Sequence, residues 1–128
     1  MMNEKFIKWE PINHISSDLY LLSLHDDSQR LKIQLEIEDS DRILIIEFAS
    51  YIAYRNTDET SRLESLNKNE ILSTRWPLFI SESSDYIDWI VTESYGITER
   101  KDLKHYVITT GTGIIDIISN QQPVVNWQ

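Results

Sequence analysis

The chain has 128 residues, no cysteine, and 21 Asp and Glu residues against 12 Lys and Arg, a formal net charge of −9. Without cysteine it forms no disulfide, cysteine-ligated zinc site or thiol nucleophile. So acidic a protein is a poor match for nucleic acids and anionic membranes, which attract basic surfaces, and its natural complement is a basic protein.

The N-terminal part of the chain is predicted to be strands. We expect an edge strand at Phe6 to Trp9 and a longer strand from Leu19 to His25, followed by a turn at Asp26 to Gln29. From Arg30 to Glu38, apolar and polar residues alternate without a break, which predicts a half-buried antiparallel strand. The first ten residues contain no apolar segment of the secretory type, which favours a cytoplasmic location.

The next predicted strand has two apolar faces. After turn residues at 39–41, Arg42 to Ala49 is apolar on both sides and should be central in the sheet or covered. With the two preceding strands it completes a β-meander. Tyr51 to Glu59 is expected to prolong this strand and then leave the sheet.

Two helices are predicted in the second half. Ser61 to Glu64 fits a capping box, which predicts a short helix over Arg62 to Lys68. After an extended segment at Trp76 to Ile80, the principal amphipathic helix is expected from Ser84 to Tyr95. Ser84 should cap its start and Gly96 should occupy the C′ position after its end.

A hairpin is predicted at the C-terminal end. His105 to Thr110 and Ile114 to Ser119 should pair across Gly111 and Thr112, and the tail with Trp127 should pack. The outline is a single α+β domain over 1–128. It has a mainly antiparallel sheet, built from the meander and the hairpin, with one principal helix and a short second helix.

The hairpin contains a candidate catalytic pair. If Thr110 pairs with Gly113, His105 and Asp116 become diagonal neighbours on one face of the sheet. Such a pair occurs in Ser–His–Asp triads, with a Ser or Thr that the sequence does not locate, and also as an ordinary structural contact. Asp116 interrupts an apolar strand, so it is either solvated or held by a partner.

Other chemistry has little support in the sequence. His25 with Asp26 and Asp27 could serve acid–base or metal chemistry, but these residues are typical of a strand end and a turn. The segment Gly111 to Gly113 lacks the spacing of a phosphate loop. We therefore predict no cofactor, no metal ligand and no catalytic residue, and keep His105 with Asp116, or His25 with the adjacent acids, only as the enzyme alternative.

The acidic residues suggest a binding surface instead. From Trp76 to Glu99 the sequence has five acidic residues and no Lys or Arg. On the principal helix this produces an acidic face edged by Trp89, with no cation nearby in the sequence to compensate it. A solvated helix face is the ordinary explanation, but such faces usually mix charges. The candidate residues for attracting a partner are Glu82, Asp85, Asp88 and Glu93.

A second candidate surface lies between Tyr51 and Glu59. Tyrosine and arginine are enriched in interface hot spots, so Tyr54, Arg55, Asp58 and Trp89 are candidates for anchoring the partner. The alternative is local: the tyrosines cover a sheet edge and Arg55 pairs with Asp58 or Glu59.

A likeness to known proteins rests on Phe48 to Glu59, Trp89, His105, Tyr106, Asp116 to Ser119 and Pro123. With these residues the chain resembles the small acidic immunity proteins that neutralise bacterial polymorphic or contact-dependent toxins. The likeness is one of general character over most of the chain and not of a defined motif. It implies tight inhibition of one cognate toxin in the cytosol and transfers no individual site residue.

We therefore expect a non-catalytic acidic binding protein of the immunity type. Its partner would be basic, for example a nuclease-like C-terminal domain of a toxin. Two alternatives stay open: a small enzyme that uses His105 with Asp116, or His25 with the adjacent acids, and a homo-oligomer in which the strand Arg42 to Ala49 meets another copy. The oligomeric state is not predicted.

Overall fold

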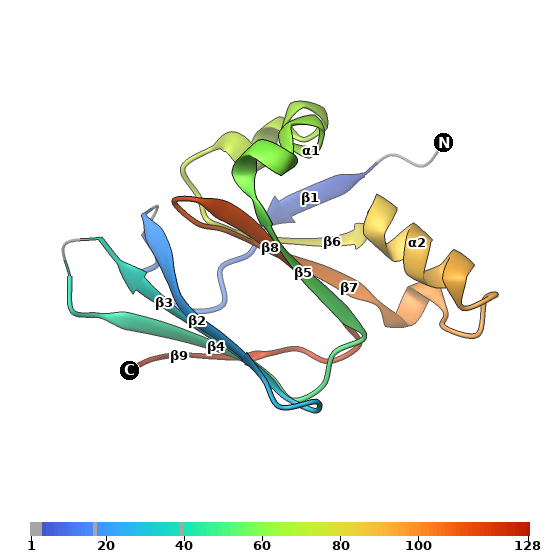
Figure 1. Cartoon of the computed structure of the whole chain (residues 1–128), viewed down its shortest axis with the longest axis horizontal. Helices are drawn as coiled ribbons and strands as arrows, with labels where there is room; N and C mark the ends of the chain where they lie inside the picture. Colours follow the sequence, from blue (N-terminus) through green and yellow to red (C-terminus); the bar gives the residue numbers. More distant parts are fainter. Residues whose placement is uncertain (1–3, 17, 39) are drawn as a thin grey trace.

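The computed structural model describes residues 4–16, 18–38 and 40–128 and confirms the predicted α+β fold with antiparallel strands (Figure 1). The predicted turn at 39–41 includes Asp39, which lies outside the described residues. The meander and the hairpin belong to two different sheets. One sheet has the order β2 (Leu19–Asp26), β3 (Leu31–Ile37), β4 (Ile43–Phe48) and β9 (Val124–Trp127). The other has the order β1 (Lys5–Lys8), β6 (Leu78–Ser83), β7 (Lys104–Thr109), β8 (Gly113–Ser119) and β5 (Ala53–Asp58).

The main core lies between the two sheets. Alternation on β3 and β4 directs one side chain in two towards the second sheet, as the sequence pattern predicts. Tyr106 is the largest of the fully buried side chains, and its ring packs edge-on against Trp9 and Phe48 at centroid distances of 5.1 Å each. β4 lies between β3 and β9, so its central position is confirmed and the C-terminal tail does pack.

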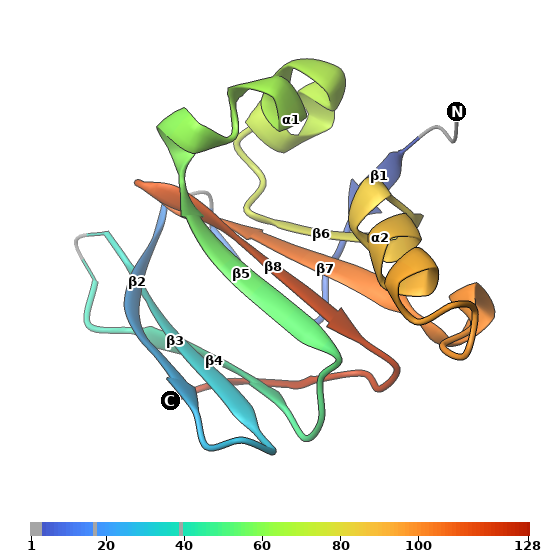
Figure 2. The same cartoon turned by 45° about the vertical axis from the view of Figure 1, so that its right-hand side comes forward.

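The outer face of the five-stranded sheet is also covered. α1 (Leu63–Lys68) and the 3₁₀ turn η2 (Glu70–Ser73) pack on one half, and α2 (Asp85–Glu93) packs on the other (Figure 2). As a result all seven residues of β8 are buried, which explains its nearly continuous apolar sequence. Two shorter 3₁₀ turns are η1 (Glu59–Ser61), which follows β5, and η3 (Arg100–Asp102), which precedes β7.

The segment after β4 differs from the prediction. It does not prolong β4 but crosses to the second sheet, where β5 pairs with β8. The crossing is fixed at Ser50, whose carbonyl accepts a hydrogen bond from Ser119 Oγ (2.9 Å), and at Ile52, whose N–H donates to Ile118 O (2.7 Å). β1 is an edge strand as predicted, but of the five-stranded sheet.

The helix ends show one confirmed cap and two corrections. Ser84 Oγ accepts the Ile87 N–H (3.2 Å), which confirms the predicted start of α2. Ser61 forms no capping box: it lies in η1, and α1 follows Arg62 without a side-chain cap. At the end of α2, Tyr95 and not Gly96 follows the C-cap, with a left-handed φ of 53°. The N–H groups of Tyr95 and Gly96 close a Schellman motif on Thr92 and Val91.

Candidate functional site

The predicted contact between His105 and Asp116 is present on the outer face of the five-stranded sheet. Thr110 N–H donates to Gly113 O (2.9 Å), and this register places the two residues diagonally across β7 and β8. His105 Nε2 lies 2.7 Å from Asp116 Oδ1, and the two side chains are 1% and 0% exposed. The pair is therefore buried on the outer face of the five-stranded sheet, between the half that α1 covers and the half that α2 covers.

Two arginines complete the surroundings of Asp116. Arg55 on β5 donates from Nε to Oδ2 (3.1 Å). Arg62, the residue before α1, reaches both carboxylate oxygens from its two terminal nitrogens, at 3.4 Å for the contact with Oδ1. Its guanidinium also donates to Thr57 Oγ1 (3.1 Å) and Ser65 Oγ (3.2 Å). Of the two alternatives for Asp116, a solvated face or a partner, the structure shows the second, whereas the alternative of a local pair for Arg55 with Asp58 or Glu59 is wrong.

These contacts keep Asp116 ionised. Burial alone would raise the pKa of its carboxyl group. The hydrogen bonds from His105 and Arg62 and the positive charge of Arg55 outweigh burial, and they hold this pKa well below its ordinary value of 3.8. The Arg62 side chain is only 10% exposed, so a fully buried carboxylate and a largely buried guanidinium neutralise one another.

Ser84 extends the pair into a line of three residues. Its Oγ lies 2.8 Å from His105 Nδ1, while the same oxygen accepts the Ile87 N–H at the start of α2. With Asp116 ionised, His105 Nε2 donates to the carboxylate, and in neutral His105 the Ser84 hydroxyl donates to Nδ1. The sequence identified Ser84 only as a helix cap.

The arrangement of this line differs from that of a catalytic triad. In a triad the Asp contacts Nδ1 of the His and the Ser contacts Nε2, and here the two contacts are exchanged. Ser84 is 1% exposed, and the rings of Phe6 and Tyr86 pack edge-on against His105 at 5.2 and 5.5 Å. A substrate could reach Ser84 Oγ only if α2 moved, so the line as it stands connects the start of α2 to the sheet.

The network reaches the surface through Arg55. The Arg55 guanidinium lies 4.2 Å from the centre of the Tyr86 ring, and that ring lies 6.1 Å from Trp89. The Arg55 side chain is 41% exposed and Trp89 is 56% exposed, whereas Tyr86 is buried beneath them. We call Arg55, Tyr86 and Trp89 the arginine–aromatic row. It connects two of the predicted anchors, Arg55 and Trp89, through the ring of Tyr86.

The predicted uncompensated acidic face is wrong. Three of its four carboxylates are paired with cations from outside the segment Trp76 to Glu99. Glu93 has no ion-pair partner among the described residues. The pairs are Glu82 with Lys104 (2.9 Å), Asp85 with Lys68 (2.8 Å), and Asp88 with Arg100.

The other two predicted anchors lie elsewhere. Tyr54 alternates with Arg55 along β5, so it points into the space between the sheets, where its hydroxyl donates to Asp26 Oδ2 (3.1 Å). Asp58 accepts the Thr60 N–H (3.2 Å) at the start of η1. The eight predicted partner-binding residues therefore do not form one surface.

His25 and Asp26 lie at the end of β2 and Asp27 belongs to the turn that follows, which is the more ordinary of the two interpretations. Asp27 Oδ1 accepts the N–H groups of Gln29 and Arg30, at 3.0 and 2.7 Å. Asp26 accepts the Tyr51 hydroxyl at 2.6 Å, and this bond raises the pKa of Tyr51 to about 12. Within residues 4–16, 18–38 and 40–128, no three His, Asp or Glu side chains are placed to hold a metal ion together.

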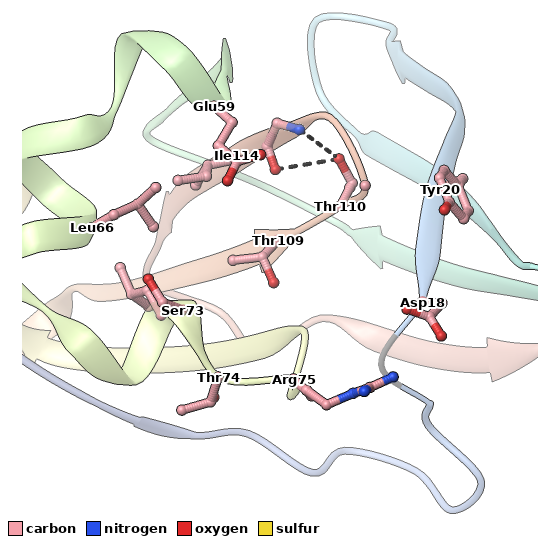
Figure 3. Close-up of a pocket in the computed structure, with 13 residues that line it drawn as sticks. Asp18, Tyr20, Glu59, Leu66, Ser73, Thr74, Arg75, Thr109, Thr110 and Ile114 are labelled. Atoms are coloured by element: carbon pink, nitrogen blue, oxygen red, sulfur yellow. Dashed lines mark hydrogen bonds between the residues drawn. The ribbon is translucent and has the colours of Figure 1, made fainter.

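A cavity of about 380 Å³ is lined by none of the residues that contact Asp116 (Figure 3). Asp18, Glu59 and Arg75 line it together with hydroxyl groups that include Thr109 and Thr110. At its edge, a Cβ on Gly111 would overlap the ring of Tyr20, which explains glycine at this hairpin turn. Of the predicted sites, only the segment Tyr51 to Glu59 reaches the cavity, through Glu59.

No family model, curated protein or solved structure that was compared matches this chain. The helices of the described segments are all too short or too polar to cross a membrane.

Proposed function

We propose that this chain is a non-catalytic protein-binding domain, and that it acts as an immunity protein for a cognate toxin domain. The arginine–aromatic row is the observation that carries this proposal. Arginine, tyrosine and tryptophan are the residues that most often dominate binding energy in interfaces, and here one of each lies in contact on one face. The resemblance to immunity proteins supplies the biological role.

The buried network supports the proposal because it holds Arg55 in place. A free arginine side chain loses rotamer freedom when it binds, and this loss reduces affinity. Arg55 is already fixed by Asp116 at Nε and by the Tyr86 ring at its guanidinium face. Its terminal nitrogens are then available to a partner at reduced entropic cost.

The end of α2 provides a second line of support. Tyr95 is 97% exposed and Ile97 is 87% exposed, at the turn that follows the helix. The left-handed conformation of Tyr95 costs on the order of 1–2 kcal/mol relative to glycine. A strained and fully exposed aromatic residue is a feature that binding sites often contain, since the partner offsets the strain.

The net charge of −9 supports a basic partner, such as a nuclease-like toxin domain. The ion pairs of Asp85 and Asp88 change which part of the surface should attract a basic partner over long range. Asp85 and Asp88 are neutralised locally, so the long-range field comes from the whole surface rather than from α2. Reversal of these two charges should therefore alter the association rate only modestly.

The test is protection of growth. The neighbouring genes are first searched for a secreted protein with a variable C-terminal domain. The chain would then be co-expressed with that domain, and wild type should restore growth. Trp89→Ala should abolish or strongly reduce protection. Val124→Ala is the matched control, because Val124 is similarly exposed (61%) but lies on β9 of the other sheet. Absent protection, or protection that survives Trp89→Ala, contradicts the proposal.

The line Ser84–His105–Asp116 favours one rival, a hydrolase. That rival requires α2 to open and Ser84 Oγ to act as a nucleophile. An assay with an activated ester would show turnover that Ser84→Ala removes. We expect no such Ser84-dependent turnover, because the hydroxyl is enclosed and already bonded on two sides.

A further inference from the structure

The outer edge of β5 differs from the other sheet edges. β1 and β2 each have a shift in register, which disrupts an edge, and β9 has only four residues. β5 keeps one register with β8 over all six of its residues. β5 is thus the longest regular edge in the described part of the chain, and in Figure 2 neither helix crosses it.

The register shows which backbone groups this edge presents. Glu59 N–H donates to Thr112 O (3.1 Å), one step beyond the pairing of Asp58 with Gly113. Hydrogen-bonded pairs alternate along an antiparallel ladder, so the groups of Arg55 and Thr57 point to β8. The position of the Thr57 carbonyl supports this assignment. Its oxygen would collide with a Cβ on Gly113, so it points towards β8. The outward N–H and C=O groups are those of Tyr54, Asn56 and Asp58.

A hollow of about 530 Å³ lies beside this edge, between the end of β5 and Leu21 on β2. Its lining includes the carboxylates of Asp58 and Glu59 and the hydroxyls of several threonines, but no lysine or arginine. It offers space for side chains of an added strand, and its charge suits basic ones.

We propose that an extended basic segment of a protein partner adds to the edge of β5 as a further strand. This inference rests on the proposed binding function and specifies its mode. Main-chain hydrogen bonds to Tyr54, Asn56 and Asp58 give affinity, and alternate side chains enter the hollow. Those on the other face lie beside Arg55 and so extend to the arginine–aromatic row. A second copy is a poor occupant, because two chains of charge −9 repel one another.

The first experiment uses a defined probe on the ¹⁵N-labelled full chain. The probe is a ten-residue peptide that alternates lysine and valine, and the same peptide with glutamate in place of lysine is its control. The lysine peptide should slow amide exchange at Tyr54, Asn56 and Asp58, while the glutamate peptide should not. Protection confined to β1, β2 or β9, or no protection, overturns the proposal.

A pair of variants tests the backbone contact itself. Asn56→Pro removes an outward N–H but keeps the bonds to β8, since proline is tolerated on edge strands. It should weaken binding of the lysine peptide roughly tenfold, the effect of about one strong hydrogen bond. Asn56→Ala, which keeps the N–H, should bind within about twofold of wild type. Equal binding by both variants contradicts strand addition, and light scattering that shows an Asn56-dependent dimer makes a second copy the occupant.

The toxin assay separates this inference from the proposed function. If Trp89→Ala abolishes protection and Asn56→Pro does not, the binding surface stands and strand addition is rejected. If neither variant changes protection, both proposals fail. Loss of protection in both variants, with Asn56→Ala and Val124→Ala unaffected, supports both.

Discussion

Asp116 and the acidic residues around α2 carry the same charge in contrasting surroundings. Asp116 is a lone acid in an apolar strand, fully buried and contacted by a histidine and two arginines. The carboxylates of Glu82, Asp85 and Asp88 are more numerous, lie at the surface and each pair with one cation. The single buried charge should affect folding far more, because water screens the others and not Asp116.

The difference teaches that the number of acids in a segment is a weak guide to their role. The segment Trp76 to Glu99 has the most conspicuous charge pattern in the sequence, yet the fold neutralises most of it. By contrast, the single carboxylate of Asp116 on β8 accepts hydrogen bonds from Arg55 on β5 and from Arg62 before α1. Through His105 it is also connected to Ser84 at the start of α2. Four predictions test this contrast: the first two concern Asp116 itself, and the other two follow in decreasing order of expected effect.

Asp116→Ala should destabilise the protein by about 3–5 kcal/mol, because it leaves Arg62 and His105 buried without their acceptor. Urea unfolding at neutral pH measures the change. Asp102→Ala, which removes an exposed carboxylate from η3, is the control and should change stability by less than about 0.5 kcal/mol. A loss below about 1 kcal/mol for Asp116→Ala would mean that the network contributes little.

Stability should depend on pH through the same group. The pKa of Asp116 is lowered by folding, so its contribution is present above the ordinary value of 3.8 and declines as the pH falls below it. Compared with Asp116→Asn, wild type should lose about 1 kcal/mol of its advantage between pH 6 and pH 3. Urea unfolding of both proteins at the two pH values measures this, and a constant difference would show that Asp116 does not titrate as described.

Ser84→Ala should destabilise by about 1–3 kcal/mol, since it removes the helix cap and leaves His105 Nδ1 without its partner. Ser94→Ala at the other end of α2 should cost less, because Ser94 Oγ contacts only nearby backbone groups. Thermal unfolding of the two variants checks the order. A reversed order would indicate that the line Ser84–His105–Asp116 adds nothing to the ordinary cap.

Glu82→Gln should have the smallest effect, within about 0.5 kcal/mol, because its pair with Lys104 is exposed and hydrated. The same urea measurement as for Asp116→Ala makes the comparison direct. A loss above about 1 kcal/mol would show that the surface pairs around α2 are stronger than this account assumes.

The sequence predicted features that depend on local pattern. Alternation located β3, a cap residue located the start of α2, and the hairpin register placed His105 beside Asp116. In each case the determining residues lie within about a dozen positions of one another, so strand period, cap chemistry or a two-residue turn suffices.

Contacts that depend on distant segments were not predicted. Arg55 and Arg62 are 61 and 54 positions from Asp116, and they reach it only because β5 crosses to the second sheet. The acids of α2 and of the end of β6 pair with cations that lie outside the segment Trp76 to Glu99, and these cations are Lys68, Arg100 and Lys104. The one available signal was Asp116 itself, since an acid inside an apolar strand requires partners.

The most direct test of the central claim is the affinity of the purified chain for its toxin domain, measured by calorimetry for wild type, Trp89→Ala and Val124→Ala. If the arginine–aromatic row is the binding surface, Trp89→Ala should raise Kd by roughly 30-fold or more, the effect of a hot-spot residue, while Val124→Ala leaves Kd within about twofold. An unchanged Kd for Trp89→Ala, or an equal loss in both variants, would contradict the claim.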